Sequence, residues 1–90
     1  EAAGNALALT VSPNPARFSA TLTVTVAEPS SVRVVVVDAL GREVAVVLDG
    51  AVAAGETVVA VETGAWPAGV YVVRATAGTQ TTTARLVVAR

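Results

Sequence analysis

A strict alternation of side chains over residues 18–26 is the feature that most limits how this chain can fold. In the stretch FSATLTVTV every second residue is apolar, and the residues between them are serine or threonine. Side chains of a β-strand point to opposite faces in turn, so this period predicts an antiparallel strand with one buried face. The residues predicted to face the core are Phe18, Ala20, Leu22, Val24 and Val26.

The rest of the chain repeats the same kind of signal. Turn residues separate further β-forming runs, which cover residues 6–11, 32–38, 43–48, 57–62, 70–76 and 81–90. Seven short strands at this spacing, with no helical period, are typical of an all-β, immunoglobulin-like antiparallel sandwich. We expect residues 1–5 to be the end of a linker and residues 6–90 to be the domain. The predicted core is Leu22, Val24, Val26, Val34, Val36, Val70, Val72 and Leu86.

The valine run within residues 32–37 departs from strict alternation. If Val34 and Val36 face the core, then Val35 and Val37 face outward beside Arg33. Two outward valines could form an apolar patch for a partner, or a neighbouring loop could cover them. The sequence does not separate these two outcomes.

Composition removes most kinds of chemistry from consideration. The 90 residues include no Cys and no His, so a disulfide framework, a thiolate metal site and the usual general base are missing. The serines have neither His nor Lys to activate them. The net charge of −1 does not favour nucleic acid. We therefore expect no catalytic residue, cofactor, metal or small-molecule substrate, and no nucleic-acid partner.

The single tyrosine lies in a stretch that has the features of a corner. Tyr71 follows Pro67 and Gly69 near the start of the sixth predicted strand. In immunoglobulin-like sandwiches a tyrosine at this place turns its hydroxyl back to the backbone a few residues upstream. We therefore predict a tyrosine corner, in which Pro67 stiffens the turn and Gly69 leaves room for the ring. Trp66 is expected to close the end of the sandwich, and a sugar-stacking platform is the alternative for this residue.

Two other turns carry polar motifs. The Pro-Asn-Pro sequence of residues 13–15 ends the first strand, because proline has no N–H for a sheet ladder. In residues 38–42 a glycine permits the turn, and we expect the flanking Asp and Arg to form a turn cap and a surface ion pair. A Ca²⁺ site there is the weaker alternative. The residues that define these motifs are Pro13, Asn14, Pro15, Asp38, Gly41 and Arg42.

Four stretches of the chain form an ordered set: SPNPARFSATLTVTV, VRVVVVDALGREV, PAGVYVVRA and ARLVVAR. Together they resemble the C-terminal sorting domain, type A, of the type IX (Por) secretion system, over residues 9–90. The chain departs from the family pattern at three positions. Val37 stands where the family usually has Tyr, Arg85 replaces the usual Lys, and Phe18 comes two positions later than the usual aromatic residue.

The resemblance implies that the domain is a non-catalytic address on a larger, upstream cargo protein. It implies passage through the periplasm, recognition by an outer-membrane translocon, removal by a sortase-like cysteine protease, and cargo at the cell surface or outside the cell. We expect the last strand to turn Leu86 and Val88 to the core. A translocon could read the outer face of this strand, its edge or its free end. The residues suspected of recognition are Arg85, Val87, Val88, Ala89 and Arg90.

A second class of function stays open. The chain also resembles the immunoglobulin-like module of flagellar hook-capping scaffold proteins, with which it shares the DxxGR and GVY elements. That resemblance implies a structural, spacer or interaction module, for example in a secreted glycoside hydrolase. A parent gene that stops at Arg90 would favour the sorting signal, and one that continues would favour the spacer.

Overall fold

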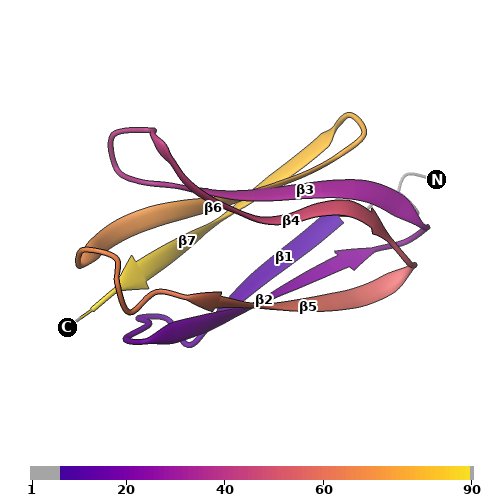
Figure 1. Cartoon of the computed structure of the whole chain (residues 1–90). Coiled ribbons are helices and arrows are strands. Elements are labelled where there is room, and N and C mark those ends of the chain that lie inside the picture. Colours follow the sequence, from indigo (N-terminus) through magenta and orange to yellow (C-terminus); the bar gives the residue numbers. More distant parts are fainter. Residues whose placement is uncertain (1–6, 90) are drawn as a thin grey trace.

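The computed structural model describes residues 7–89, and these form two antiparallel sheets packed face to face (Figure 1). One sheet has the strand order β1-β2-β5 and the other has the order β4-β3-β6-β7. The predicted all-β, immunoglobulin-like sandwich of seven strands is confirmed. The predicted linker end lies outside the described residues. The strands are β1 (Leu7–Ser12), β2 (Ser19–Val26), β3 (Ser30–Val37), β4 (Glu43–Val52), β5 (Gly55–Glu62), β6 (Gly69–Ala77) and β7 (Gln80–Val88).

The fourth strand is paired with the third. In constant-type immunoglobulin domains the fourth strand belongs to the opposite sheet, whereas here β4 runs along β3 at the edge of the larger sheet. The β3–β4 register shifts between Val34 and Val35 and again between Val36 and Val37, as at β-bulges. Such irregularities make an edge strand less suited to pairing with another strand. In the part of the chain that the structure describes, no helix is long and apolar enough to cross a membrane.

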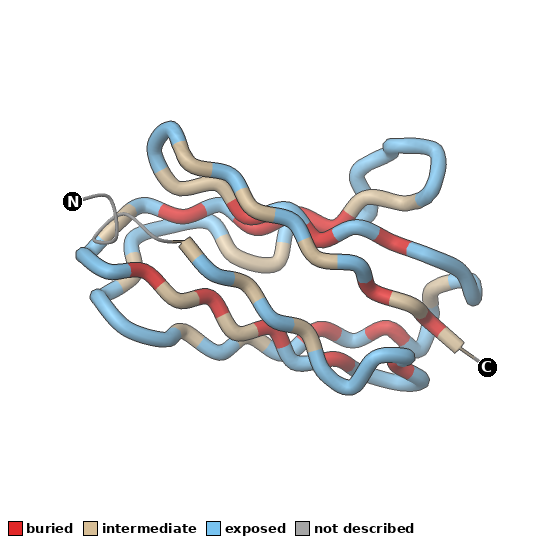
Figure 2. Tube along the Cα trace, turned by 180° about the vertical axis from the view of Figure 1, so that it is seen from behind, coloured by how far each residue is buried: buried red, intermediate tan, exposed pale blue. Residues whose placement is uncertain are grey.

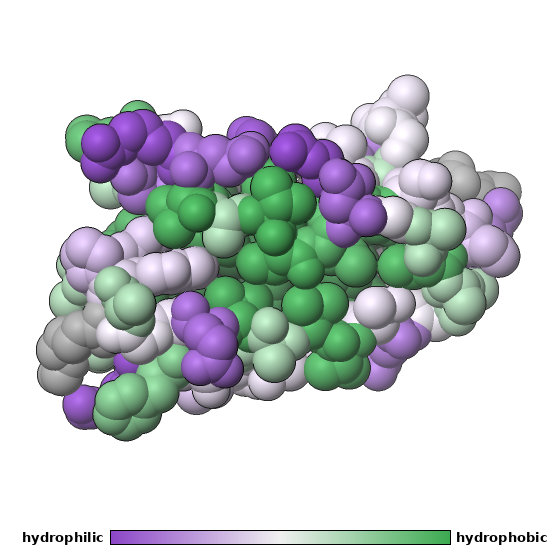
Figure 3. All heavy atoms as spheres, in the orientation of Figure 1, coloured by the Kyte–Doolittle hydropathy of each residue, from purple (hydrophilic) through white to green (hydrophobic). Residues whose placement is uncertain are grey.

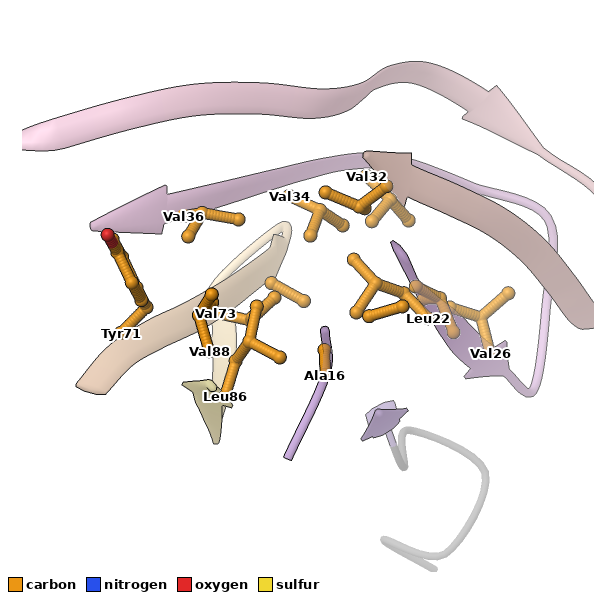
Figure 4. Close-up of a cluster of buried hydrophobic side chains, with 14 residues drawn as sticks. Ala16, Leu22, Val26, Val32, Val34, Val36, Tyr71, Val73, Leu86 and Val88 are labelled. Carbon is orange, nitrogen blue, oxygen red and sulfur yellow. The ribbon is translucent and has the colours of Figure 1, made fainter. Parts of the chain in front are cut away.

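Buried side chains alternate along the strands and meet between the two sheets (Figure 2). Leu22, Val34 and Leu86 are fully shielded from solvent, and the close-up in Figure 4 shows such side chains from both sheets pointing into one shared space. Burying an aliphatic side chain of this size stabilises the fold by about 1.5–3 kcal/mol. The confirmed core predictions are Leu22, Val24, Val26, Val34, Val36 and Leu86.

Two predicted core residues on β6 are wrong. Val70 and Val72 are 46% and 36% exposed, whereas Tyr71 and Val73 are buried. The run VYVV has a β-former at every position, so its pattern does not choose a face. The register with β7 places Tyr71 opposite the buried Leu86, and a slip of one residue would turn every side chain of the strand to the other face.

The prediction that Phe18 faces the core is also wrong, because its side chain is 76% exposed. β2 begins at Ser19, so Phe18 lies in the preceding loop, where the alternation of a strand does not apply. Its carbonyl oxygen accepts a hydrogen bond from the Thr63 N–H at 2.9 Å. Phe18 therefore ties two loops together through its backbone while its ring lies at the surface.

The two long sides of the sandwich differ. On one side β1 lies beside β7, and Ala16 forms a parallel bridge with Val88. On the other side the edge strands β4 and β5 are not hydrogen-bonded to each other. Figure 3 shows an apolar band on this side, between more polar borders. Val47, Leu48 and Val59 of these two strands are only partly buried against the core.

Candidate recognition end of the sandwich

The turns that carry the sequence motifs all lie at one end of the sandwich, which we call the motif end. It consists of residues 13–18, 38–42 and 63–68 and the last residues of β7. Because consecutive strands are antiparallel, every second connection falls at the same end. The first strand begins at the opposite end, and Figure 1 shows the start of β1 and the end of β7 at opposite ends of the sandwich. The domain is 42 Å long and 22 Å wide, so these ends are well separated.

The tyrosine corner is present as predicted. The Tyr71 hydroxyl donates a hydrogen bond of 2.6 Å to the carbonyl oxygen of Pro67, and the ring is almost completely buried. Trp66 packs against the core with its ring centroid 5.3 Å from that of Tyr71, so it helps to close this end of the sandwich. The reason predicted for Gly69 is wrong, because an added Cβ would meet nothing within 4 Å. Its φ of 156° is instead a conformation that other residues rarely adopt.

The turn at residues 38–42 is held by one carboxylate. Oδ1 of Asp38 accepts the N–H groups of Leu40 at 2.9 Å and Arg42 at 3.0 Å, and Oδ2 accepts Nε of Arg42 at 3.0 Å. These contacts, above all the Arg42 N–H, lower the pKa of Asp38, although partial desolvation opposes them. Gly41 has a φ of 84°, which glycine adopts without strain. The predicted turn cap and ion pair are therefore both present.

Asn14 has a role that the sequence did not predict. Its side-chain amide donates a 2.7 Å hydrogen bond to the Arg85 carbonyl oxygen and accepts the Val87 N–H at 3.0 Å. An amide side chain carries one acceptor and one donor group, so it can pair with a strand edge as a backbone does. Two residues later, Ala16 donates its N–H to Val87 O at 2.7 Å and accepts the Ala89 N–H at 2.8 Å.

These contacts cover the outer edge of β7 near its end. Residues 14–16 take up the outward-pointing backbone groups between Arg85 and Ala89, while β6 occupies the other edge of the strand. Pro13 and Pro15, which flank Asn14, have no N–H to offer. A partner strand therefore finds this part of the edge already paired, which leaves the outer face as the accessible surface of the strand.

The residues suspected of recognition differ in the direction of their side chains, some of which face outward while others face the core. Arg85 is exposed, and Val87 and Ala89 are half-buried with their side chains turned away from the core. Leu86 and Val88 face the core, as predicted for this strand. Because the side chain of Val88 is buried, a partner cannot contact it, and Val88 can contribute to recognition only by holding the strand in place. Arg90 lies outside the described residues.

Each motif of this end is held by hydrogen bonds between residues of the domain. Within residues 7–89, no group of three or more His, Cys, Asp or Glu side chains lies close enough together to hold a metal ion. The fold and the motif end thus define a small immunoglobulin-like module whose turns and last strand form one surface at the motif end. The model of the family described as the secretion system C-terminal sorting domain matches residues 10–89, and the chain belongs to this type IX secretion family.

Family membership identifies the domain as a C-terminal sorting signal for type IX secretion, of a kind that is generally non-catalytic. The cargo of such a signal is exported to the cell surface or the extracellular space. A search of curated proteins found no match to this chain.

Proposed function

We propose that the domain travels through the periplasm as the folded end of a cargo protein, and that the outer-membrane translocon of the type IX system reads its motif end. The observation that carries this proposal is the separation of the two ends of the sandwich. Cargo joined upstream of β1 lies at the end opposite the motif end. The motif end is then the end of the sandwich farther from the point where the cargo is attached.

The last strand supplies side chains to this recognition. Arg85 and Val87 point away from the core, and the buried neighbours Leu86 and Val88 hold them in place. Asn14 fixes the strand from its edge through two hydrogen bonds. The proposed recognition set is Arg85, Val87, Ala89 and Arg90, with Val88 as the residue that anchors the strand in the core.

We further propose that a sortase-like cysteine protease removes the domain after translocation, and that the cargo is then anchored at the surface or released. The cut is expected before Leu7, because β1 is hydrogen-bonded to β2 along its whole length from that residue on. Proteases cut most readily where the backbone is not engaged in such pairing. The mass of the exported cargo will show whether the domain has been removed and where.

A pair of reporter fusions tests the proposed function. A reporter joined before residue 1 is expected at the surface of a type IX host, and in a translocon-deficient strain it is expected to stay in the periplasm. The same reporter joined after residue 90 is expected to be retained, because it covers the motif end. Retention of the first fusion would contradict the sorting function. Equal export of both fusions would contradict recognition at the motif end.

A further inference from the structure

The outer face of the four-stranded sheet carries a continuous apolar surface. Three directly paired positions place valines side by side across the strands: Val35 with Val46, Val37 with Val72, and Val70 with Val87. Paired residues of an antiparallel sheet share a face and lie about 4.5–5.5 Å apart at Cβ. We call this surface the valine face, and it consists of Val35, Val37, Val46, Val70, Val72 and Val87.

The centre of the valine face is shielded by its own neighbours. Val35 is only 2% exposed, yet it is not part of the core between the sheets. The residues opposite it on this face are Val46 and Arg74. Val35 therefore faces outward as predicted, and of the two outcomes that the sequence left open for it, an exposed patch or a covered residue, it is a covered residue. The exposed apolar area lies around it, at Val46, Val70 and Val72.

Two unpaired cations border the valine face. Arg85 lies opposite Val72, and Arg74 lies opposite Val35. Both are exposed, and within residues 7–89 neither guanidinium has an acidic partner. Arg33 at the other border does have acidic partners. Its Nη2 lies 3.7 Å from Oε1 of Glu43, and its Nε lies 3.9 Å from Oδ2 of Asp49. The β6–β7 half of the face is therefore apolar and positively charged.

The size of this surface decides which kind of association it suits. The whole outer side of this sheet, with four strands about 4.8 Å apart and roughly eight residues long, has a flat outline on the order of 500 Å², and the six valines occupy only part of it. A stable protein–protein interface buries about 800 Å² on each partner, and smaller ones belong mainly to transient contacts. A permanent dimer through this face would be under-sized. A contact that is made and released during transport fits its area.

We propose that the valine face binds a partner protein that presents apolar side chains beside carboxylates, as a transient contact during export. This inference rests on the proposed sorting function and deepens it, because it places part of the recognition on the sheet face beyond β7. Valines would exclude water at the centre of the contact, and Arg74 and Arg85 would pair with the carboxylates at its border. An Arg–carboxylate pair can be bidentate, which orients the partner as well as attracting it.

Two paired variants and two matched controls test this proposal in the reporter fused before residue 1. Val70→Thr/Val72→Thr keeps the β-branched shape and removes apolar area, and Arg74→Glu/Arg85→Glu reverses the border charges. Val58→Thr and Glu56→Gln are single changes of the same two kinds, loss of apolar area and change of charge, on the outer face of the three-stranded sheet, where Val58 is 64% exposed. Export of each paired variant is expected to fall by about tenfold or more. Both controls are expected to export normally, and all four domains to keep their melting temperature.

The outcomes separate this inference from the proposed function. Normal export of both folded paired variants overturns the valine face as a binding surface. The purified domain could also be a dimer that becomes a monomer in the Val70→Thr/Val72→Thr variant, as measured by sedimentation. A second copy of the domain would then occupy the valine face, and the proposed partner would be overturned. If the unaltered fusion itself is retained, the sorting function fails and this inference fails with it. Loss of export in the two paired variants alone supports it.

Discussion

The outer faces of the two sheets differ in chemistry, although both sheets bury their inner faces in one core. The three-stranded sheet presents mainly hydroxyl groups, with Thr23 opposite Thr10 and Thr21 opposite Ser12, and one strongly exposed valine, Val58. The four-stranded sheet presents the valine face, bordered by arginines. Threonine is β-branched like valine, so it favours a strand equally well while keeping a hydrated group on the surface. The first face is therefore suited to water and the second to a protein partner.

The difference is already present in the strand sequences. β2 reads SATLTVTV, in which every outward position is polar, whereas β3 ends in VVVV and β6 begins GVYVV. A strand needs apolar residues only on its buried side, so the outward valines of β3 and β6 are not required by the core. Their presence on two neighbouring strands is what makes the valine face continuous.

The largest effect is expected from a change on the inner side of β2. Leu22→Ala should lower the free energy of unfolding by roughly 2–5 kcal/mol, because it leaves a cavity in a fully buried position. The adjacent outward change Thr21→Ala should stay within about 0.5 kcal/mol. Denaturant unfolding of both variants gives the comparison. Similar losses for the two would show that β2 does not separate a core face from a solvent face.

A smaller effect is expected where Asn14 fixes β7. Asn14→Ala removes two hydrogen bonds to the strand edge and should cost about 1–2 kcal/mol, since water can reach these groups. Asn14→Asp keeps the acceptor for the Val87 N–H but loses the donor to the Arg85 carbonyl. It should therefore fall between Asn14→Ala and the unaltered domain in thermal unfolding. Hydrogen exchange at Val87 that is unchanged in Asn14→Ala would contradict this role.

The tyrosine corner sets which residues of β6 face outward. Tyr71→Phe keeps the buried ring and removes only the bond to the Pro67 carbonyl, so it should cost about 1 kcal/mol. Val70 and Val72 should stay exposed, because the ring still anchors the register. Calorimetry gives the stability change, and the melting temperature should fall by a few degrees. An unchanged melting temperature would show that the hydroxyl bond does not stabilise the corner.

The smallest effect concerns the turn that joins β3 to β4. The pKa of Asp38 is lowered in the folded domain, so its carboxylate stabilises the fold above the ordinary pKa of about 3.8. This contribution is lost as the pH falls through the lower folded pKa. In Asp38→Asn the stability should be reduced at neutral pH and should approach that of the unaltered domain in acid. A difference that stays constant from pH 7 to pH 2 would contradict this account.

Sequence reasoning was most successful where one physical requirement acted alone. The alternation of β2 predicted its buried face, and the spacing of Tyr71 from Pro67 predicted the corner, since both depend on residues close in the chain. It was wrong about Val70 and Val72, because in a continuous run of β-formers the face is chosen by pairing with another strand. Phe18 shows the same limit, since the strand begins one residue later than the alternation indicates.

The candidate site was less predictable than the fold because its contacts are distant in sequence. The side chain of Asn14 meets β7 more than 70 residues away, and no local pattern indicates that contact. The valine face depends on the order of four strands, which sequence alone did not establish. Arg85 and Val87 were expected to face outward, but their continuity with Val70 and Val72 follows only from the sheet register.

Thiol labelling tests the central difference between the two faces most directly, because the chain contains no cysteine of its own. Val72→Cys and Val58→Cys place one thiol on the outer face of each sheet. In the purified domain both thiols should react readily with a maleimide. In cells with cargo arrested at the translocon, labelling at position 72 should slow by about tenfold while labelling at position 58 stays unchanged. Equal labelling of the two positions in arrested cells would contradict the assignment of the valine face to partner binding.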